Sequence, residues 1–476
     1  MQGHDVALIC SADDHQSYLV RKAEALGMTP DDAADMFTDD IERTLSLASI
    51  EVDAFTRPRR SPNHATFVRS FFMEAAARGL IEARDYPSFA CPTCERTLYD
   101  FDAVGRCGYC GAACDGGLCE ECGRLIGAGS LVEPRCGRCG TTPNVVPTRR
   151  LVLLISQLER ELSDFHASPR SRPHTHGLWK AFLADGLPDT PISIESTWGV
   201  PVDVPGFDSH RWWVWAEMGP GYIATTATLG EEWEDVWREA NAEIVQFFGY
   251  DNSPFQILLH PALLLAHGGY RLPDHFIVNE FYLLDGSKFS STRNHAVWGV
   301  DILSNVPVDV VRYFLAATGP ETEQTNFTLR EFQNRVNHEL AGELEHCIRL
   351  TATGSGVRTG LVANLVNRAQ MVGAALEPQA FSMRQATALW ADMVREAARA
   401  EDATPEERAQ ALSLLASTAA PLMPEFAARL WGVLGSPGDL RTHPWGTPAS
   451  TAAVDAMPAE PWFAAVSDAQ LAASQR

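Results

Sequence analysis

The chain has no hydrophobic run long enough to cross a bilayer, and positive charge is scarce along it. A membrane-spanning helix needs about 20 consecutive apolar residues. The 476 residues include 38 Lys and Arg against 61 Asp and Glu, which gives a net charge of −23. This deficit of positive charge argues against broad non-specific binding to nucleic acid or to anionic membranes, and it leaves a local basic patch open. We therefore expect a cytoplasmic protein of two or three domains.

Cysteine is scarce outside one stretch, in which four Cys-x-x-Cys pairs follow one another. The pairs are Cys91/Cys94, Cys107/Cys110, Cys119/Cys122 and Cys136/Cys139. Two such pairs supply the four thiolates of a closed tetrahedral zinc site, so four pairs predict two structural zinc ions. A disulfide scaffold is the less favoured interpretation, because the sequence shows no signal-peptide pattern and the chain is too long to need such cross-links.

The spacing of the cysteine pairs favours a nested arrangement. The second and third pairs are close enough to form one site, which leaves the first and fourth pairs to close an outer site. A cross-braced arrangement, in which the first pair joins the third, stays open. Three cysteines are left over, namely Cys10, Cys114 and Cys347. Of these, Cys114 is either a spare ligand or, by the simpler interpretation, a plain thiol.

Strand and helix signals alternate as far as about Gly299, a pattern typical of a parallel α/β sheet. Residues 6–11 predict a short buried strand, and 65–81 predict a helix before the cysteine block. Residues 202–222, rich in Trp and Tyr, predict a second strand region. In such sheets ligands bind beyond the carboxyl ends of strands. Asp13 and His15, which follow the first predicted strand, are therefore candidate site residues.

Helix signals dominate the remainder of the chain. Thr29 and Pro30, like Thr404 and Pro405, form the start of a helix, with Thr as the N-cap and Pro at the first position. The pattern is helical throughout residues 328–434. We expect an irregular tail beyond Pro437, with a last helical turn in its final residues.

Seven motifs occur in one order along the chain. They are GHDVALICSADDH, the four cysteine pairs, WGVPV, WVWAEMGPGY, DGSKFSSTR, NFTLREFQNRVN and APLMPEF. In this order they resemble the methionyl-tRNA synthetase family, over nearly the whole chain. The resemblance implies an α/β class I catalytic domain with a Rossmann-type parallel sheet, a zinc-knuckle insertion with the nested pairing, and a C-terminal α-helical bundle. The expected parts are catalytic residues 1–88 and 191–325, an insertion at 89–190 with knuckles at 91–140, and an anticodon-binding-like domain at 326–476.

The resemblance also implies roles for single residues. Asp13 matches the acid that holds the substrate ammonium group, for which a carboxylate is the natural partner. Trp215 and Tyr222 match the aromatic walls of the amino-acid pocket, and Asp251 matches an active-site acid. Lys288 lies in the match to the mobile KMSKS loop, where a lysine stabilises charge on the ATP phosphates. The candidate set also contains His15, Met218 and Gln256 for the substrate and Ser290 and Ser291 for the nucleotide.

The chain departs from the family pattern in its catalytic segments. The first strand of the family and its HIGH motif have no counterpart here, so we expect either a true start roughly 40 residues upstream or a site completed by another segment or chain. In the amino-acid pocket, Gln256 stands where the family has a histidine, and Met218 with Gly219 replaces an Ala-Pro pair. Ser291 replaces the second lysine of the KMSKS loop. The pocket changes put methionine itself in doubt as the substrate.

The helical end departs as well. The positions at which the family reads the anticodon align with His346 and Leu350, and the stretch that should carry a Trp is shortened. Unpaired bases are recognised by stacking aromatic side chains and by hydrogen-bonding groups. Methionine-specific reading of a tRNA anticodon is therefore not expected.

The matches and departures leave three possible functions for the protein. The preferred prediction is a ligase that uses ATP with Mg²⁺ to form an aminoacyl adenylate for a non-translational acceptor. An N-hydroxylated amine is such an acceptor, as in hydrazine-forming enzymes, and a separate cupin or N-hydroxylase would then be the partner protein. The first alternative is a divergent methionyl-tRNA synthetase that charges tRNA. The second is a non-catalytic homologue that binds an amino acid, a nucleotide or a protein.

Overall fold

The computed structural model describes residues 3–168, 170–230, 233–238, 242–290, 295–353, 360–399, 403–449 and 458–475. The chain divides into two compact units. One consists of Met1–Val6, Asp40–Glu51 and Asn279–Arg476, and the other of Ala7–Asp39 and Val52–Val278. Each unit has its own hydrophobic core. Among the described helices, none is both long enough and apolar enough to cross a membrane.

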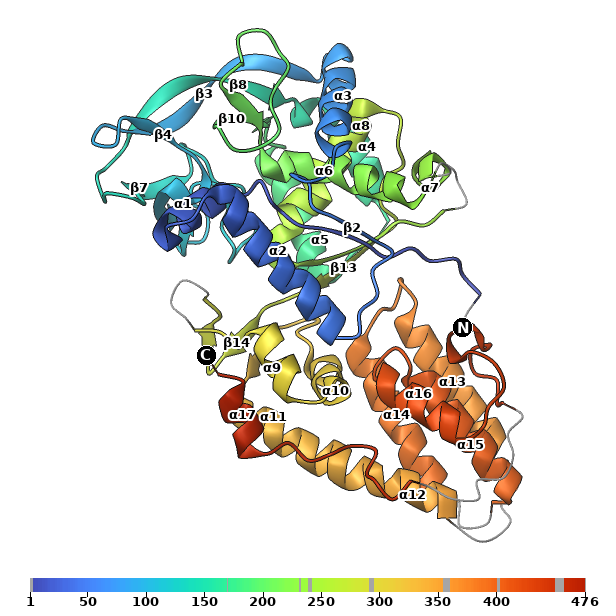
Figure 1. Cartoon of the computed structure of the whole chain (residues 1–476). Coiled ribbons are helices and arrows are strands. Elements are labelled where there is room, and N and C mark those ends of the chain that lie inside the picture. Colours follow the sequence, from blue (N-terminus) through green and yellow to red (C-terminus); the bar gives the residue numbers. More distant parts are fainter. Residues whose placement is uncertain are drawn as a thin grey trace. The chain divides into compact units, whose positions relative to one another are not determined.

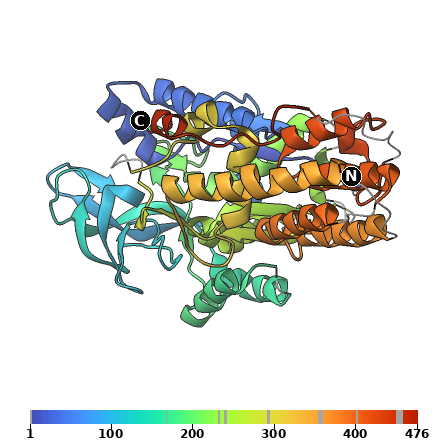
Figure 2. The same ribbon diagram turned by 90° about the horizontal axis from the view of Figure 1, so that it is seen from below.

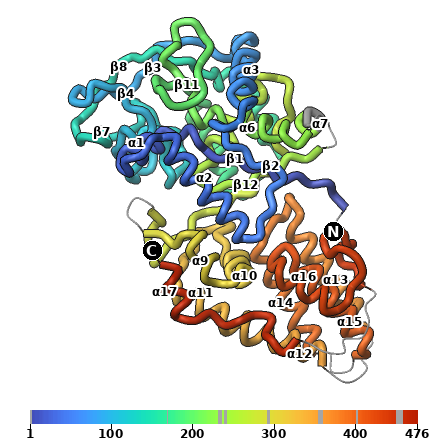
Figure 3. Tube along the Cα trace, viewed as in Figure 1, coloured from blue at the N-terminus to red at the C-terminus, as the bar shows by residue number. Residues whose placement is uncertain are grey.

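The 7–39 and 52–278 unit begins with two short parallel strands. β1 (Ile9–Ser11) pairs with β2 (Ala54–Thr56), and Figure 3 shows the two strands side by side. The strand predicted from residue 6 is too long, because Val6 is 79% exposed and only β1 has a partner to pair with. The helices predicted after it are present as α1 (Ser17–Leu26) and α2 (Pro30–Leu47). The Thr29 hydroxyl accepts a hydrogen bond from the Asp32 amide at 3.1 Å and caps α2.

The cysteine block lies between two long antiparallel strands. β3 (Ile81–Cys91) pairs with β8 (Asn144–Leu153) through ten residue pairs, and the knuckle strands form the cyan part of Figure 2. Those strands are β4 (Arg96–Leu98), β5 (Ala103–Cys107), β6 (Ala113–Asp115) and β7 (Leu131–Cys136). The helix predicted as far as residue 81 ends earlier, as α3 (His64–Ala77). Gly79, at φ +80°, turns the chain from that helix into β3.

The strand predicted over residues 202–222 is wrong for most of its length. Only β11 (His210–Trp212) is a strand, and it pairs antiparallel with β10 (Ser193–Glu195). The residues that follow form helix α6 (Val214–Thr226). Trp and Tyr favour strands, but Trp215, Met218 and Tyr222 have the three- and four-residue spacing of one helix face.

Seven elements of this unit remain, of which α8 packs against α6. They are α4 (Glu159–His166), α5 (Pro173–Asp185), β9 (Thr190–Pro191), α7 (Trp233–Arg238), β12 (Val245–Gly249), α8 (His260–His267) and β13 (His275–Asn279). Among the described residues, the strands form six small sheets, and parallel pairing is recorded for β1 with β2 and for β14 with β16. One continuous Rossmann-type sheet therefore stays a prediction, as do the four domain limits expected from the sequence.

The other unit is mostly helical, as its sequence predicts. Helices α13 to α16, orange to red in Figure 1, pack on one another, and the buried Trp390 of α14 donates to the Leu415 carbonyl at 3.1 Å. Thr404 and Glu407 form the capping box that starts α15. A last turn is present as α17 (Asp468–Ala473). The elements are β14 (Tyr282–Leu284), β15 (Ser287–Lys288), α9 (Gly299–Asn305), α10 (Val308–Thr318), β16 (Thr325–Phe327), α11 (Leu329–Arg335), a π-helical segment (Val336–Leu344), α12 (Glu345–Thr353), α13 (Leu361–Leu376), α14 (Met383–Ala398), α15 (Pro405–Ala419) and α16 (Pro424–Val433).

Candidate functional site

The eight paired cysteines form two separate clusters. Their members are Cys91, Cys94, Cys136 and Cys139 in the outer cluster, and Cys107, Cys110, Cys119 and Cys122 in the inner cluster. The nested pairing is confirmed, and the cross-braced alternative is wrong. Sulfur–sulfur distances are 3.5 and 3.9 Å in the outer cluster and 3.6 and 3.7 Å in the inner one. Zinc–sulfur bonds of about 2.3 Å in a tetrahedron place the sulfurs about 3.8 Å apart, so both clusters fit such an ion.

The chain turns in the same way after each pair. The residue that follows the second cysteine has a positive φ in all four pairs, at 52° for Glu95 and at 77°, 69° and 74° for Gly111, Gly123 and Gly140. This left-handed residue closes a tight turn, and in the last three pairs its amide donates to the carbonyl of the first cysteine. Three of the four positions are glycine because a side chain there is strained. The local sequence therefore shapes each knuckle. Cys114 lies in β6, outside both clusters.

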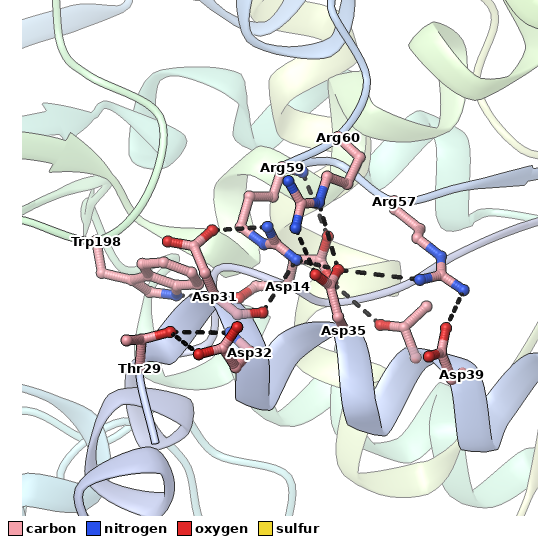
Figure 4. A network of polar contacts seen from close by, with 11 residues as sticks. Asp14, Thr29, Asp31, Asp32, Asp35, Asp39, Arg57, Arg59, Arg60 and Trp198 are labelled. Atoms are coloured by element: carbon pink, nitrogen blue, oxygen red, sulfur yellow. Dashed lines mark hydrogen bonds and ion pairs between the residues drawn. The ribbon is translucent and has the colours of Figure 1, made fainter. Parts of the chain in front are cut away.

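The candidate amino-acid site begins at the loop after β1, where Asp13, Asp14 and His15 follow one another. Asp14 is buried and fixes this loop. Its carboxylate accepts from the Thr38 hydroxyl and from the Arg59 amide, each at 3.3 Å, and its carbonyl accepts from Trp198 Nε1 at 3.0 Å (Figure 4). Because Asp14 is held on three sides, the neighbouring Asp13 and His15 are held in place.

An ion-pair network ties α2 to the segment after β2 (Figure 4). Arg59 Nη1 lies 2.6 Å from Asp31, Arg57 Nη2 lies 2.7 Å from Asp39, and Arg59 and Arg60 both pair with Asp35. The acids stand four residues apart and so share one face of α2. The network therefore holds the Arg59 amide against Asp14 and supports the loop that carries Asp13.

His15 belongs to a buried polar triad. His15 Nδ1 and His64 Nε2 each lie 2.7 Å from the same oxygen of Glu217, which is carried by α6. Burial lowers the pKa of His15, but the charge and hydrogen bond of Glu217 outweigh it and raise that pKa overall. Burial raises the pKa of Glu217, and the two histidines outweigh it, so that this pKa is lowered. The triad therefore keeps a negative charge inside the protein beside the Asp13 loop.

Asp13 keeps solvent access, yet surrounding protein raises the pKa of its carboxyl to about 6. Desolvation is the largest cause. A hydrogen bond with Gln16 opposes it, and the negative charges of Glu217 and Asp14 add to it. Such a group loses its proton near pH 6 and can then pair with an ammonium group.

Helix α6 carries Trp215, Met218 and Tyr222 of the predicted pocket and packs against β1. The Trp215 ring is stacked on Phe255, with ring centroids 4.0 Å apart and planes 9° apart. Gln256 Nε2 donates to the Tyr222 hydroxyl at 2.7 Å. The charge of Asp13 is one of the causes, after burial, that raise the pKa of Tyr222. The structure therefore brings Tyr222 and Gln256 into contact, and the charge of Asp13 acts on Tyr222, while Met218 is half-buried on the same helix as Tyr222.

The predicted nucleotide residues lie apart from one another along the chain. Asp251 is in a short 3-10 turn (Tyr250–Asn252) after β12, and its carboxylate accepts from the Asn252 amide at 3.1 Å. Lys288 belongs to the other unit, where it is exposed at β15 and its Nζ lies 4.4 Å from the centre of the Phe281 ring. Ser290 exchanges two backbone hydrogen bonds of 2.9 Å with His295. Ser291 lies outside the described residues.

Sequence reasoning missed Glu217, His64 and His260. Glu217 lies inside the quoted motif WVWAEMGPGY, and His260 follows Gln256 by one helical turn. The motif around Glu217 and the four-residue spacing of His260 from Gln256 could therefore have indicated both residues. Nothing near His64 in the sequence indicates that it meets Glu217 across 153 residues.

Comparison with known proteins places this arrangement in a family. Residues 1–351 match the profile of the family described as tRNA synthetases class I (M). A Methionine--tRNA ligase of Christiangramia forsetii is 33% identical over 351 residues, which are 71% of this chain and 50% of that protein. One from Pyrobaculum calidifontis is 30% identical over 478 residues, covering 92% of this chain and 84% of that protein. The chain thus spans about half the length of the first relative.

A solved structure has the same fold. It is the Mycobacterium tuberculosis methionyl-tRNA synthetase bound by methionyl-adenylate, with a TM-score of 0.74 at 20% sequence identity. The likeness covers 97% of this chain and 92% of that one. It confirms an α/β synthetase fold with two four-cysteine clusters and C-terminal helices.

Proposed function

The chain belongs to the family of class I methionyl-tRNA synthetases, and on this premise we propose that it activates an amino acid with ATP to an aminoacyl adenylate. The observation that carries the proposal is the hydrogen bond from Gln256 to the Tyr222 hydroxyl of α6, a helix that packs against β1, the strand that precedes the Asp13 loop. A carboxylate beside an aromatic wall suits the ammonium group and side chain of an α-amino acid.

The reaction needs no covalent enzyme intermediate. An oxygen of the amino-acid carboxylate forms a bond to the α-phosphorus of ATP, and the bond from that phosphorus to the bridging oxygen breaks. Pyrophosphate leaves with the electron pair. Asp13 would hold the ammonium group and thereby orient the attacking carboxylate. Lys288 would stabilise the charge that develops on the phosphates. Asp251 would be a further residue that binds the nucleotide. Mg²⁺ supplies further positive charge when it is bound with ATP.

The comparisons favour tRNA as the acceptor of the acyl group. The relatives described above are Methionine--tRNA ligases, so the alternative predicted from the sequence is better supported than the preferred one. An N-hydroxylated amine as acceptor, the link to hydrazine-forming enzymes, and a cupin or N-hydroxylase partner find no support in them. We propose transfer to tRNA as the second step.

A non-tRNA acceptor is the second candidate, and one feature of the helical unit favours it. His346 and Leu350 stand one turn apart on α12, both exposed, and Leu350 is 42% exposed. An exposed leucine offers a base neither a hydrogen bond nor an aromatic face. Reading of an anticodon by this helix face is therefore weakened.

The two cysteine clusters have a structural role in this proposal. Each offers four thiolates with no position left for a substrate, which is the donor set of a closed zinc site. We propose that the outer and inner clusters each hold one zinc ion and that both ions stabilise the insertion rather than take part in the reaction.

Amino-acid-dependent exchange of pyrophosphate into ATP tests adenylate formation. Lys288→Ala should lower the exchange rate by about 10²–10³ with little change in amino-acid affinity. The matched control is Lys180→Ala, which removes an exposed lysine of α5 and should leave the rate unchanged. Equal rates for Lys288→Ala and the wild-type protein would rule out the role given to Lys288.

The acceptor is tested by a second measurement on the same enzyme. A labelled amino acid is incubated with ATP and either total tRNA or hydroxylamine, which traps an adenylate as a hydroxamate. Label on tRNA would support the tRNA ligase. Hydroxamate without labelled tRNA would support the second candidate.

A further inference from the structure

The candidate amino-acid pocket contains buried polar atoms that have no partner within the described part of the chain. We propose that this pocket selects an amino acid whose neutral side chain carries both a hydrogen-bond donor and an acceptor, a hydroxyl or a carboxamide, in place of a thioether. The inference rests on the proposed adenylate formation but not on which molecule accepts the acyl group.

Gln256 supplies the acceptor. Its side chain is in the helical segment Phe255–Leu259 before α8 and is only 4% exposed. The amide nitrogen Nε2 donates to the Tyr222 hydroxyl at 2.7 Å. The amide oxygen Oε1 has no hydrogen-bond partner among the described residues. A buried carbonyl oxygen without a partner is unfavourable, and a ligand that donates to it relieves that cost.

His260 supplies the donor. It is 3% exposed, and burial lowers its pKa to about 3, so the ring is neutral at physiological pH. Gln246 Nε2 donates to His260 Nδ1 at 2.9 Å, so that Nδ1 is the acceptor nitrogen of the ring. In a neutral imidazole the proton then lies on the other nitrogen. That nitrogen, Nε2, has no partner within the described residues.

Both groups contact Tyr222. Gln256 and His260 stand four residues apart in consecutive helical segments, which places them on one side of the helix. Gln256 bonds the Tyr222 hydroxyl, and the His260 ring meets the Tyr222 ring edge-on at a centroid distance of 5.5 Å. Gln256 therefore contacts Tyr222 at its hydroxyl, and His260 contacts it at its ring.

Gly219 makes room for this arrangement. A Cβ atom added at Gly219 would lie 3.0 Å from His260 Cδ2, closer than most real contacts of this kind. The position is on α6, one turn before Tyr222. The absence of a side chain at this position therefore allows the imidazole to approach α6. Glycine at 219 and histidine at 260 form a matched pair, and both bear on the shape of the pocket.

Substrate side chains of different chemical classes differ in the hydrogen bonds that they can form with Gln256 and His260. A hydroxyl or carboxamide can donate to Gln256 Oε1 and accept from His260 Nε2. A thioether cannot donate and accepts only weakly, so it leaves both protein groups without good partners. A charged side chain would gain no counter-ion from a neutral imidazole and an amide. A site that hydrogen-bonds a polar group of its substrate strongly rejects an analogue without that group. This discrimination is greater than the one by which an apolar site rejects a side chain of the wrong size.

The test is pyrophosphate exchange by the full chain with serine, threonine, asparagine and glutamine against methionine and leucine. At least one polar amino acid should have a kcat/KM about 100-fold above that of methionine. Gln256→Leu and His260→Phe should each remove most of that preference by lowering the value for the polar amino acid. The control Thr387→Val, which removes a buried hydroxyl of α14, should leave the preference unchanged. Circular dichroism of each variant verifies that it folds.

The possible failures are distinguishable. Preference for methionine, or equal kcat/KM for all six amino acids, would overturn the inference and leave adenylate formation intact. Exchange with no amino acid would instead contradict the proposed function. Calorimetric titration with non-reactive aminoacyl sulfamoyl adenosines then decides the inference. Tighter binding of a polar analogue than of the methionyl analogue supports it, and tighter binding of the methionyl analogue, or no binding at all, overturns it.

Discussion

The cysteine clusters and the His15–Glu217–His64 triad both gather side chains that could hold a metal ion, yet they differ in how the donor atoms meet. In each cysteine cluster the four sulfurs face one another, and sulfur–sulfur contacts within the clusters measure 3.5–3.9 Å. In the triad, two ring nitrogens lie at 2.7 Å from one shared oxygen of Glu217. Those are hydrogen-bond distances between a donor and an acceptor.

The difference shows why two groups of side chains that could each bind a metal ion can have different roles. Four thiolates repel one another and need a cation at their centre, whereas a carboxylate between two imidazoles already has a hydrogen-bond partner in each ring. We infer that the cysteine clusters depend on zinc for their structure and that the triad needs no metal. It supports the Asp13 loop by hydrogen bonding alone.

Of the changes compared here, loss of zinc should have the largest effect on the stability of the protein. A structural zinc ion contributes about 10 kcal/mol or more of apparent binding free energy to a folded site. Cys119→Ser should therefore unfold the inner knuckle and lower the zinc content from two ions to one. The measurements are metal analysis and thermal unfolding with and without a chelator.

Cys114→Ser is the matched control for this experiment, because Cys114 lies in β6 close to the inner cluster but belongs to neither cluster. It should keep both ions and the unfolding temperature. An equal loss of zinc from both variants, or no loss from either, would contradict the ligand sets.

Removal of the shared carboxylate should have the next largest effect. Glu217→Leu leaves two buried histidine rings without their acceptor, which should cost about 3 kcal/mol of unfolding free energy. Glu217→Gln keeps an oxygen for the rings and should cost less. Urea unfolding at fixed pH measures both. Added zinc should change neither the wild-type nor the variant value, and a stabilisation by zinc that Glu217→Leu abolishes would mean that the triad is a metal site.

The pH dependence of this effect follows from the two pKa shifts. His15 has a raised pKa, so its contribution is complete below its ordinary value of 6.5 and is lost as the pH rises through the folded value. Glu217 has a lowered pKa, so its contribution is complete above its ordinary value of 4.5 and is lost as the pH falls through the folded value. The difference between the wild-type protein and Glu217→Gln should therefore be greatest between pH 4.5 and 6.5.

The smallest effect concerns Asp13, which responds to the charge of the triad. Because the pKa of Asp13 is about 6, its carboxylate becomes protonated below that pH and no longer pairs with the ammonium group. The KM for the amino acid should then rise about tenfold per pH unit. Glu217→Gln removes a negative neighbour and should shift the midpoint to lower pH. A midpoint unchanged in Glu217→Gln would contradict an anionic Glu217 beside Asp13.

Short-range features were predicted well. The start of α2 at Pro30 and the capping box of Thr404 follow from residues three positions apart, as does each cysteine knuckle. The strand predicted over residues 202–222 failed because aromatic content was weighed above the helical spacing of Trp215 and Tyr222. The Asp13 site was indicated only by its position after a strand and by resemblance, and its roles remain predictions.

The sequence alone determined the four cysteine pairs, the helical unit and the family, because each depends on neighbouring residues or on the order of motifs, whereas the structure decided which cysteine pairs share a cluster. Only the tertiary structure decided that Glu217 joins His15 to His64, and that Gln256 and His260 contact Tyr222 while each keeps one polar atom without a partner among the described residues. These contacts join residues as far as 202 positions apart. No local spacing encodes them, because they depend on how α6 packs against β1, α3 and α8.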